Sequence, residues 1–201
     1  MITGPDISSH QHESGQPLDF AAVKAAGHTF VVVKATEGSS YVNPFFRRDV
    51  LAARAAGLVT WPYIWVSPGD GAQQGRYAVQ EINKVFPAGT LVWLDYEQEG
   101  VSHVVLHDVR ATVEATGYRT GTYTFPDYWQ RVGVQSCQEC GSRPLWWADY
   151  NPAHNRPAPA PWTSCALRQT HGTSYTVPGI PGLNDMSRAE VDLAKIGRAH
   201  V

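Results

Sequence analysis

The sequence predicts an α/β protein, an irregular, TIM-like β/α barrel of about eight strands whose later strands lack full helices. Three observations predict it. Apolar runs of strand length alternate with helix-like segments as far as about residue 130, the helical pattern then fades, and short strand candidates continue toward the end of the chain. Repeated alternation of strand and helix implies right-handed crossovers between parallel strands.

The first elements follow one another closely. Residues 30–38 (FVVVKATEG) form a continuous apolar run of strand length, which is typical of a buried parallel strand. In residues 44–57 apolar side chains recur at approximately helical spacing, and Gly57 ends this stripe. The alternation then repeats, with strand candidates at residues 60–71, 90–97 and 119–125 and helix-like segments at residues 71–86 and 101–117.

Beyond residue 130 only short strand candidates remain, at residues 144–151, 165–172 and 179–186. With residues 4–10 at the start of the chain, they bring the total to about eight. The Pro-rich residues 151–162 (NPAHNRPAPAPW) are expected to form a surface loop.

Composition limits the classes of protein. A chain of 201 residues with 43% hydrophobic residues suits one domain with a sizeable core. The formal net charge of -2 gives no electrostatic reason to expect nucleic acid or an anionic membrane as a partner. No apolar run reaches the ~18 residues that span a bilayer, and the first residues lack the basic and apolar regions of a signal peptide. We therefore expect a soluble monomer without an export signal.

Asp95 and Glu97, at the end of the apolar run LVWLDYE, are the most informative feature of the chain. Side chains alternate along a strand, so these two carboxylates point the same way while Tyr96 points to the opposite face. Two close carboxylates do not ionise with equal ease, because each raises the pKa of the other, and one of them can then stay protonated as an acid. This pair indicates a glycosidase, although an isolated D-x-E is more often a solvated strand end.

Other acids and aromatic residues are expected at the same rim of the barrel. Asp6, Glu37 and Asp185 also fall at the predicted C-terminal ends of strands, where a β/α barrel binds its ligands. Aromatic rings stack on sugar rings, and amides bind hydroxyl groups. The aromatic and amide candidates for this role are Tyr63, Trp65, Tyr123, Trp147 or its neighbour Trp146, Tyr150, Gln169 and Asn184.

Six segments stand in a distinctive order along the chain: GPDISSHQ, FVVVKATEGSSYVNPFF, RAAGLVTWPYIW, LVWLDYE, PLWWADYN and VPGIPGLNDMS. In order and spacing they resemble the glycoside hydrolase family 25 lysozymes, and the resemblance covers residues 2 to about 193. It implies an irregular β/α barrel that cleaves the β-1,4 bond between N-acetylmuramic acid and N-acetylglucosamine in bacterial peptidoglycan. Its partners would be peptidoglycan glycan strands, with no nucleic acid and no membrane.

The resemblance also implies roles for the acids. Glu97 would be the general acid/base, Asp95 the carboxylate that assists the anomeric centre, and Asp6 and Asp185 the flanking acids of the cleft. Asp95 would either attack directly or orient the N-acetyl group of the substrate, and we favour the second route; both retain configuration. No metal or other cofactor is needed. The chain departs from the family where Tyr63-Ile64-Trp65 replaces Y-H-F and where Gln169-Thr170-His171 replaces W-Q-Y.

Other functional classes remain open at this stage. A non-catalytic wall-binding module is the main alternative, and an unrelated barrel enzyme is disfavoured because no Gly-rich phosphate loop follows the late strands. The missing signal peptide suggests a bacteriophage endolysin made in the host cytoplasm and released onto the bacterial cell wall. A wall-remodelling enzyme exported by another route is the alternative.

The three cysteines allow several arrangements. We expect Cys165 to pair with Cys137 or Cys140 in oxidised protein. A zinc site and a redox-active C-x-x-C pair are the alternatives; the first lacks a second C-x-x-C and the second lacks a thioredoxin-like context. His103 and His107 stand at i and i+4 of a predicted helix, but a solvated helix face is the better interpretation of that spacing.

The last six residues, 196–201 (IGRAHV), lack helical periodicity and match one reading frame of a common DNA-sequencing adapter. We therefore divide the chain into a catalytic domain, residues 1–195, and a non-native tail, residues 196–201. The tail is expected to contribute nothing to folding or catalysis, because terminal segments without burial tolerate truncation.

Overall fold

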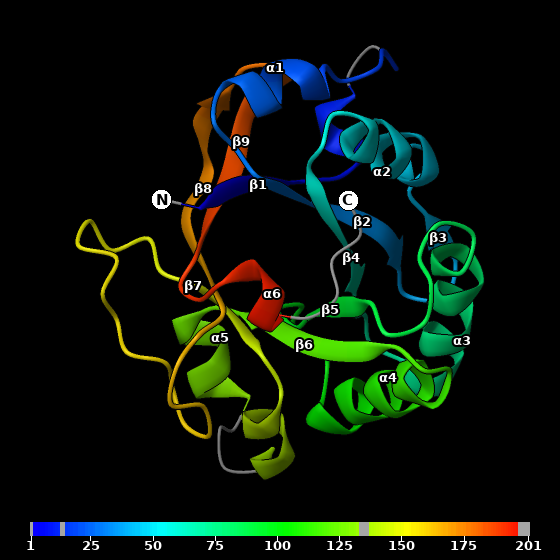
Figure 1. Ribbon diagram of the computed structural model, residues 1–201. Helices are drawn as coiled ribbons and strands as arrows, with labels where there is room; N and C mark the ends of the chain where they lie inside the picture. Colours follow the sequence, from blue (N-terminus) through cyan, green and yellow to red (C-terminus); the bar gives the residue numbers. More distant parts are fainter. Residues whose placement is uncertain (1, 13–14, 133–136, 197–201) are drawn as a thin grey trace.

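One sheet of nine strands closes into a barrel, which confirms the fold class that the sequence predicts (Figure 1). The structure is a computed structural model that describes residues 2–12, 15–132 and 137–196. The strand order is β1-β9-β8-β7-β6-β5-β4-β2, and β2 pairs again with β1, so eight strands complete the ring while the short β3 pairs with β2. The strands are β1 (Thr3–Ile7), β2 (Phe30–Glu37), β3 (Tyr41–Val42), β4 (Val59–Trp65), β5 (Leu91–Asp95), β6 (Arg119–Thr124), β7 (Leu145–Ala148), β8 (Leu167–Val177) and β9 (Ile180–Ala189).

Helices cover the first half of the barrel far better than the second. The helices are η1 (Ser9–Gln11), α1 (Phe20–Ala25), α2 (Phe46–Ala55), α3 (Gly71–Ile82), α4 (His103–Ala115), α5 (Pro126–Arg131), η3 (Gln138–Ser142) and α6 (Leu193–Ile196). Asp70 and Ser102 cap α3 and α4, since each side chain accepts a hydrogen bond from a first-turn backbone N–H. After β6 the described residues contain only the six-residue α5 and the short η3 before β7, and β8 connects directly to β9. The later strands lack full helices, as expected.

The last strand runs against its neighbours. β9 is antiparallel to both β8 and β1, whereas the other pairs of barrel strands are parallel. Only Pro178 and Gly179 separate β8 from β9, and a parallel connection needs a crossover of a dozen residues or more. The expectation that Asp185 ends its strand is therefore wrong. Asp185 lies within β9, directly opposite Asp6 of β1, and reaches the expected rim from the opposite direction.

The core has two layers, one inside the barrel and one between the barrel and its helices. The inner layer includes Phe30, Trp61 and Trp93, which are completely buried. A glycine at position 121 of the neighbouring β6 makes room for the Trp93 ring, since a Cβ there would lie 2.5 Å from a ring carbon of Trp93. The barrel interior is thus filled with large side chains, which fixes the strands that carry the acids.

The helix α6 lies across the end of the barrel that faces the viewer in Figure 1, opposite to the rim that carries the acids. Ile196 at its end is only 1% exposed and packs with the inner layer of the core. This burial speaks against the expectation that the chain contributes nothing to folding from residue 196 onward, and the stability of variants at Ile196 tests it. Residues 197–201 lie outside the described residues, and their origin stays a prediction.

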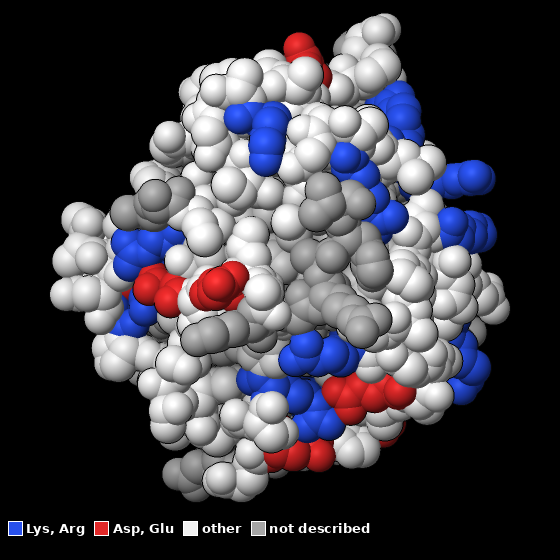
Figure 2. Space-filling view, in the orientation of Figure 1, with Lys and Arg blue, Asp and Glu red and all other residues white. Residues whose placement is uncertain are grey.

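The surface around α6 carries charges of both signs. Figure 2 shows this face, on which lysine and arginine side chains lie in several places beside acidic ones. Among the described residues, no helix combines the length and apolar character needed to cross a membrane.

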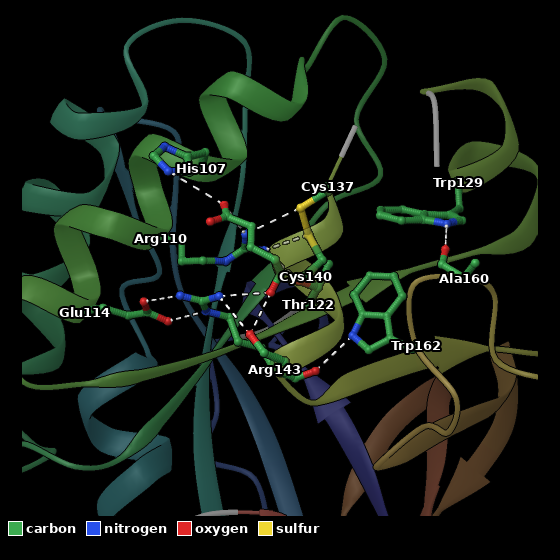
Figure 3. Close-up of a disulfide and its surroundings, with 12 residues drawn as sticks. His107, Arg110, Glu114, Thr122, Trp129, Cys137, Cys140, Arg143, Ala160 and Trp162 are labelled. Carbon is green, nitrogen blue, oxygen red and sulfur yellow. Dashed lines mark hydrogen bonds and ion pairs between the residues drawn. A yellow bond between two sulfur atoms is a disulfide. The ribbon is translucent and has the colours of Figure 1, made fainter. Parts of the chain in front are cut away.

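The expected pairing of Cys165 is wrong. Cys137 and Cys140 form a disulfide, with Cα atoms 5.4 Å apart, next to η3 (Figure 3). The buried Arg110 of α4 donates hydrogen bonds to both sulfur atoms, at 3.6 and 3.2 Å. Cys165, just before β8, is a buried free thiol that accepts a hydrogen bond from Arg168 of that strand, and burial raises the pKa of this thiol. Cys137 and Cys140 are bonded to each other, so no cysteine is left to pair with Cys165.

Burial of Ile196 leads to a stability prediction. Ile196→Ala should lower the free energy of unfolding by about 2 kcal/mol, because it leaves a cavity at the end of the barrel core. Deletion of residues 197–201 serves as the control and should leave the stability unchanged. Urea unfolding of both variants measures the difference, and equal stability of Ile196→Ala and the wild type would show that α6 does not close the core.

Candidate active site

Four carboxylates from three parts of the chain gather at one rim of the barrel. Asp95 is the last residue of β5 and is buried, and Glu97 follows two residues later. Asp6 of β1 is buried as well and lies opposite Asp185 of β9 in the strand register. The structure therefore brings together all four acids for which the sequence predicts a catalytic role.

Burial and mutual repulsion hold protons on this cluster. Burial, the charge of Asp185 and that of Glu97 raise the pKa of Asp6 well above its ordinary value. Burial and the charge of Glu97 do the same for the pKa of Asp95. Burial and Asp185 raise the pKa of Glu97 to about 7, against the opposing effects of the Tyr123 hydroxyl and Lys34. A carboxyl group with a pKa near 7 can act as a general acid at neutral pH.

Lys34 is the buried cation of the site, and sequence reasoning missed it. Its Nζ lies 2.6 Å from Glu37 Oε2 and 4.7 Å from the centre of the Trp65 ring, and its charge lowers the pKa of both Asp95 and Glu97. Strict alternation would place residues 34 and 37 on opposite faces of β2, but the register shifts between Lys34 and Thr36. This irregularity brings Lys34 and Glu37 to the same side.

Gln169 of β8 links the acids to two tyrosines. Its Nε2 donates to Asp6 Oδ2 at 2.9 Å, and its Oε1 accepts hydrogen bonds from the hydroxyls of Tyr123 and Tyr150. Because Gln169 is only 2% exposed and holds these three partners, it orients the acid cluster rather than facing a ligand. These contacts speak against direct substrate binding by Gln169, and substrate binding by Tyr123 and Tyr150 stays a prediction.

A cavity of about 370 Å³ opens beside the acids. Of the residues expected to bind the substrate, Glu37, Tyr63 and Trp65 line it, together with Asp6 and Asp185. The sequence analysis did not single out the other lining residues, which besides Lys34 and Ile7 include Ser8, His10, Gln11 and Thr173. Ser8, His10 and Gln11 belong to η1 and its N-cap, which a capping box between Ser8 and Gln11 defines in the sequence SSHQ.

Thr173 fixes the position of Asp185. Its backbone N–H and its Oγ1 both donate to Asp185 Oδ1, the second at 3.1 Å. Thr173 has a φ of 37°, a left-handed conformation that is rare for a β-branched residue. Backbone strain of this kind is tolerated where the surrounding contacts determine the conformation, and here those contacts hold one of the four acids in place.

Neither tryptophan of β7 lines the cavity beside the acids. Trp147 is buried in the outer layer of the core, and the pocket that it lines contains Trp129 and Pro126 rather than the acids. Trp146 points into the barrel, where it packs against Tyr63, Trp93 and Tyr123 and donates to Ser187. The expectation for Trp147 is therefore wrong, and the alternation of the strand gives the reason.

The site has the groups for acid chemistry on an acetal. A protonatable Glu97 lies beside a second carboxylate, Asp95, whose Oδ1 has no hydrogen-bond partner among the described residues. Within that part of the chain, no three His, Cys, Asp or Glu side chains are grouped so that they could hold a metal ion. The arrangement supplies one proton donor and one negative charge, which is the requirement for glycoside hydrolysis.

Comparison with known proteins agrees with this chemistry. The sequence matches glycosyl hydrolases family 25 over residues 5–180. It is 30% identical over 181 residues to the N,O-diacetylmuramidase of a Chalaropsis species, a match that covers 81% of this chain and 81% of that protein. A lysozyme of Lactococcus phage mv1 is 33% identical over 127 residues, 54% of this chain and 61% of that protein. The structure of a muramidase from Acremonium alcalophilum has a TM-score of 0.78 at 26% identity, with 98% of this chain and 97% of that chain covered.

The buried acids should cost stability at neutral pH. A carboxyl whose pKa is raised by folding binds its proton more tightly in the folded than in the unfolded state, so stability falls as the pH rises above about 4, the ordinary aspartate pKa. Asp95→Asn removes this penalty and should raise the melting temperature at pH 7, with a gain that shrinks toward pH 4. Calorimetry at both pH values tests this. A variant that melts below the wild type at pH 7 would show that the charge of Asp95 stabilises the fold.

Proposed function

The chain belongs to glycosyl hydrolases family 25, and we propose that it is a lysozyme that cleaves the β-1,4 bond between N-acetylmuramic acid and N-acetylglucosamine in bacterial peptidoglycan. The observation that carries the proposal is the pair Asp95 and Glu97, in which burial and neighbouring charge raise the pKa of Glu97 to about 7. Family membership makes the chain a glycosidase, and the muramidase and lysozyme relatives support the choice of bond.

In the proposed reaction Glu97 protonates the leaving glycosidic oxygen. The C–O bond then breaks, and positive charge develops at the anomeric carbon and the ring oxygen. Negative charge on the Asp95 side of the site stabilises this oxocarbenium-like centre. After the leaving sugar departs, Glu97 is ionised and takes a proton from the water that attacks the anomeric carbon, so the enzyme returns to its starting state.

We favour substrate assistance for the first step. The carbonyl oxygen of the N-acetyl group would attack the anomeric carbon, and Asp95 would orient that group by accepting its N–H. Asp95 Oδ1 supports this assignment, because it is buried and has no partner among the described residues. Attack by the substrate's own group followed by attack of water inverts the centre twice and retains configuration.

A non-catalytic wall-binding module is the second candidate. The acid cluster speaks against it, because a module that only binds would gain nothing from three carboxyl groups whose pKa values burial and mutual charge raise. Buried charges of one sign cost stability, and such costs are typical of sites that perform chemistry.

For the place of action, we propose the bacterial cell wall, reached by release from a phage-infected host. The similarity to the lysozyme of Lactococcus phage mv1 supports this proposal. Co-expression in a bacterial host of the enzyme with a membrane-permeabilising holin tests it: lysis that requires both proteins supports release from the cytoplasm, and lysis without the holin contradicts it.

Glu97→Gln tests the assignment of the acid. The amide cannot supply the proton to the leaving oxygen, so the rate should fall by on the order of 10²-fold or more while the protein still folds. The measurement is the loss of turbidity of a peptidoglycan suspension. Glu99→Gln is the matched control, since this neighbouring acid side chain is 82% exposed and should be dispensable. Lysis by a folded Glu97→Gln protein at the wild-type rate would refute the role of Glu97.

The pH profile gives a second test. Glu97 must be protonated, so kcat/KM should fall as the pH rises through about 7. Asp95 must be ionised, and because its pKa is also raised, the acidic limb should lie above the ordinary aspartate range. Lys34→Met removes a charge that lowers both pKa values, so both limbs should move to higher pH, whereas Lys34→Arg should largely restore the wild-type profile. Limbs that do not move in Lys34→Met would contradict the role of Lys34.

A further inference from the structure

A second pocket, of about 300 Å³, adjoins the acid cluster through Tyr150. The hydroxyl of Tyr150 bonds to Gln169 within the catalytic network, whereas its ring lines the second pocket and leaves the residue 53% exposed. Phe125, Asp127 and Arg156 form other parts of the wall. The proposed lysozyme reaction does not use this pocket, but Tyr150 connects its wall to the acid cluster through Gln169, which donates to Asp6.

Arg156 gives the pocket a cation that is not committed elsewhere. Its closest carboxylate is Asp149, with Nε 3.9 Å from Oδ1, and its side chain is half exposed. Asp149 is completely buried and already pairs with Arg168 at 2.7 Å, so its charge is balanced without Arg156. An exposed guanidinium with a partner that is otherwise satisfied is free to bind a carboxylate from a ligand.

The loop that carries Arg156 is held by its backbone. The N–H of Arg156 donates to Asp149 Oδ2 at 2.9 Å, and its carbonyl accepts from Arg168 Nη1 at 2.9 Å. The guanidinium takes part in neither bond. A substitution of the Arg156 side chain therefore removes the charge from the pocket without releasing the loop.

The two pockets differ in charge. The wall of the larger cavity carries the acids Asp6, Glu37 and Asp185, and its lysine, Lys34, is paired with Glu37. The second pocket carries Arg156 together with the exposed Asp127. Arg156 can bind a carboxylate of a ligand, and Asp127 can accept hydrogen bonds from its N–H groups. A short peptide offers both, whereas an unsubstituted sugar offers neither a carboxylate nor several N–H groups.

We propose that the pocket between Tyr150 and Arg156 binds the peptide stem that is attached to the lactyl group of the muramyl residue, with Arg156 contacting a stem carboxylate. The inference rests on the proposed function, and it makes the enzyme selective for glycan strands that still carry their peptides. A bidentate guanidinium contact to a carboxylate in a partly enclosed pocket supports a preference of about tenfold.

Three soluble substrates test the proposal: strands with peptide stems, strands with stems whose carboxylates have been converted to amides, and strands from which an amidase has removed the stems. Arg156→Gln should lower kcat/KM about tenfold on the first substrate, mainly through KM, and leave the other two within twofold of the wild type. Arg156→Lys should retain part of the preference, because it keeps the charge without the planar fork. Arg131→Gln is the control, since Arg131 is similarly exposed on the neighbouring α5 and should be neutral on all three.

The remaining outcomes overturn the proposal in distinct ways. An equal loss on all three substrates would mean that Arg156 contacts the glycan or supports the fold, and unchanged kinetics on all three would mean that it contacts nothing. A loss confined to stem-free strands would assign Arg156 to the free lactyl carboxylate that the amidase exposes. Failure of the wild type to cleave any strand would refute the lysozyme activity itself, and is thereby distinguished from failure of the pocket.

Discussion

Pairing of β9 with β1 closes the barrel, and the arrangement of the acids depends on that contact. It sets Asp185 opposite Asp6, although the two residues come from the last and the first strand. β8, the other partner of β9, places Gln169 so that its amide donates to Asp6. A barrel that opened at this seam would keep Asp95 at the end of β5 and Glu97 just after it, but would lose both flanking acids. The site is therefore a property of the closed sheet and not of one motif.

Closure also creates an electrostatic cost that the rest of the structure has to offset. The carboxyl groups lie close together and are largely buried, so burial and mutual repulsion raise the pKa values of Asp6, Asp95 and Glu97. Lys34 offsets part of this repulsion, and the large side chains inside the barrel hold the strands in place. The same repulsion that opposes folding keeps a proton on Glu97 near neutral pH, so the cost and the proposed chemistry have one origin.

The sequence alone predicts the features that follow from local periodicity. Alternation of strands and helices predicts the barrel, and the D-x-E spacing predicts that Asp95 and Glu97 share a side. Lys34 was missed because a register shift in β2 breaks the alternation that a sequence pattern assumes. The sequence did not show which of Trp146 and Trp147 faces the barrel interior, because a strand of only four residues has no clear alternation of apolar and polar side chains.

The predictions of the direction of β9 and of the cysteine pairing were wrong for a related reason. The first depends on the turn between two strands, and the second depends on how neighbouring segments pack. The sequence VPGI at residues 177–180 contains the Pro-Gly signal of a tight turn, and it would have predicted that β8 and β9 form a hairpin. With that direction known, Asp185 falls in the middle of a strand. The cysteines offered no comparable signal, because the position of Arg110 beside Cys137 and Cys140 follows only from the packing of α4 (Figure 3).

The irregularity of the barrel bears on specificity. Where α3 and α4 follow their strands, the outer face of the barrel is covered by packed helices whose close contact requires the glycine at position 75. After β6 and β7 the chain instead forms the short α5 and an extended loop, and it is there that the pocket with Tyr150 and Arg156 opens. A regular barrel would place a full helix after β7, in the stretch that now supplies Arg156. The missing helix thus gives the rim a second, differently charged pocket next to the acids, so the side of the fold that is least regular is the side that can distinguish one substituted glycan from another.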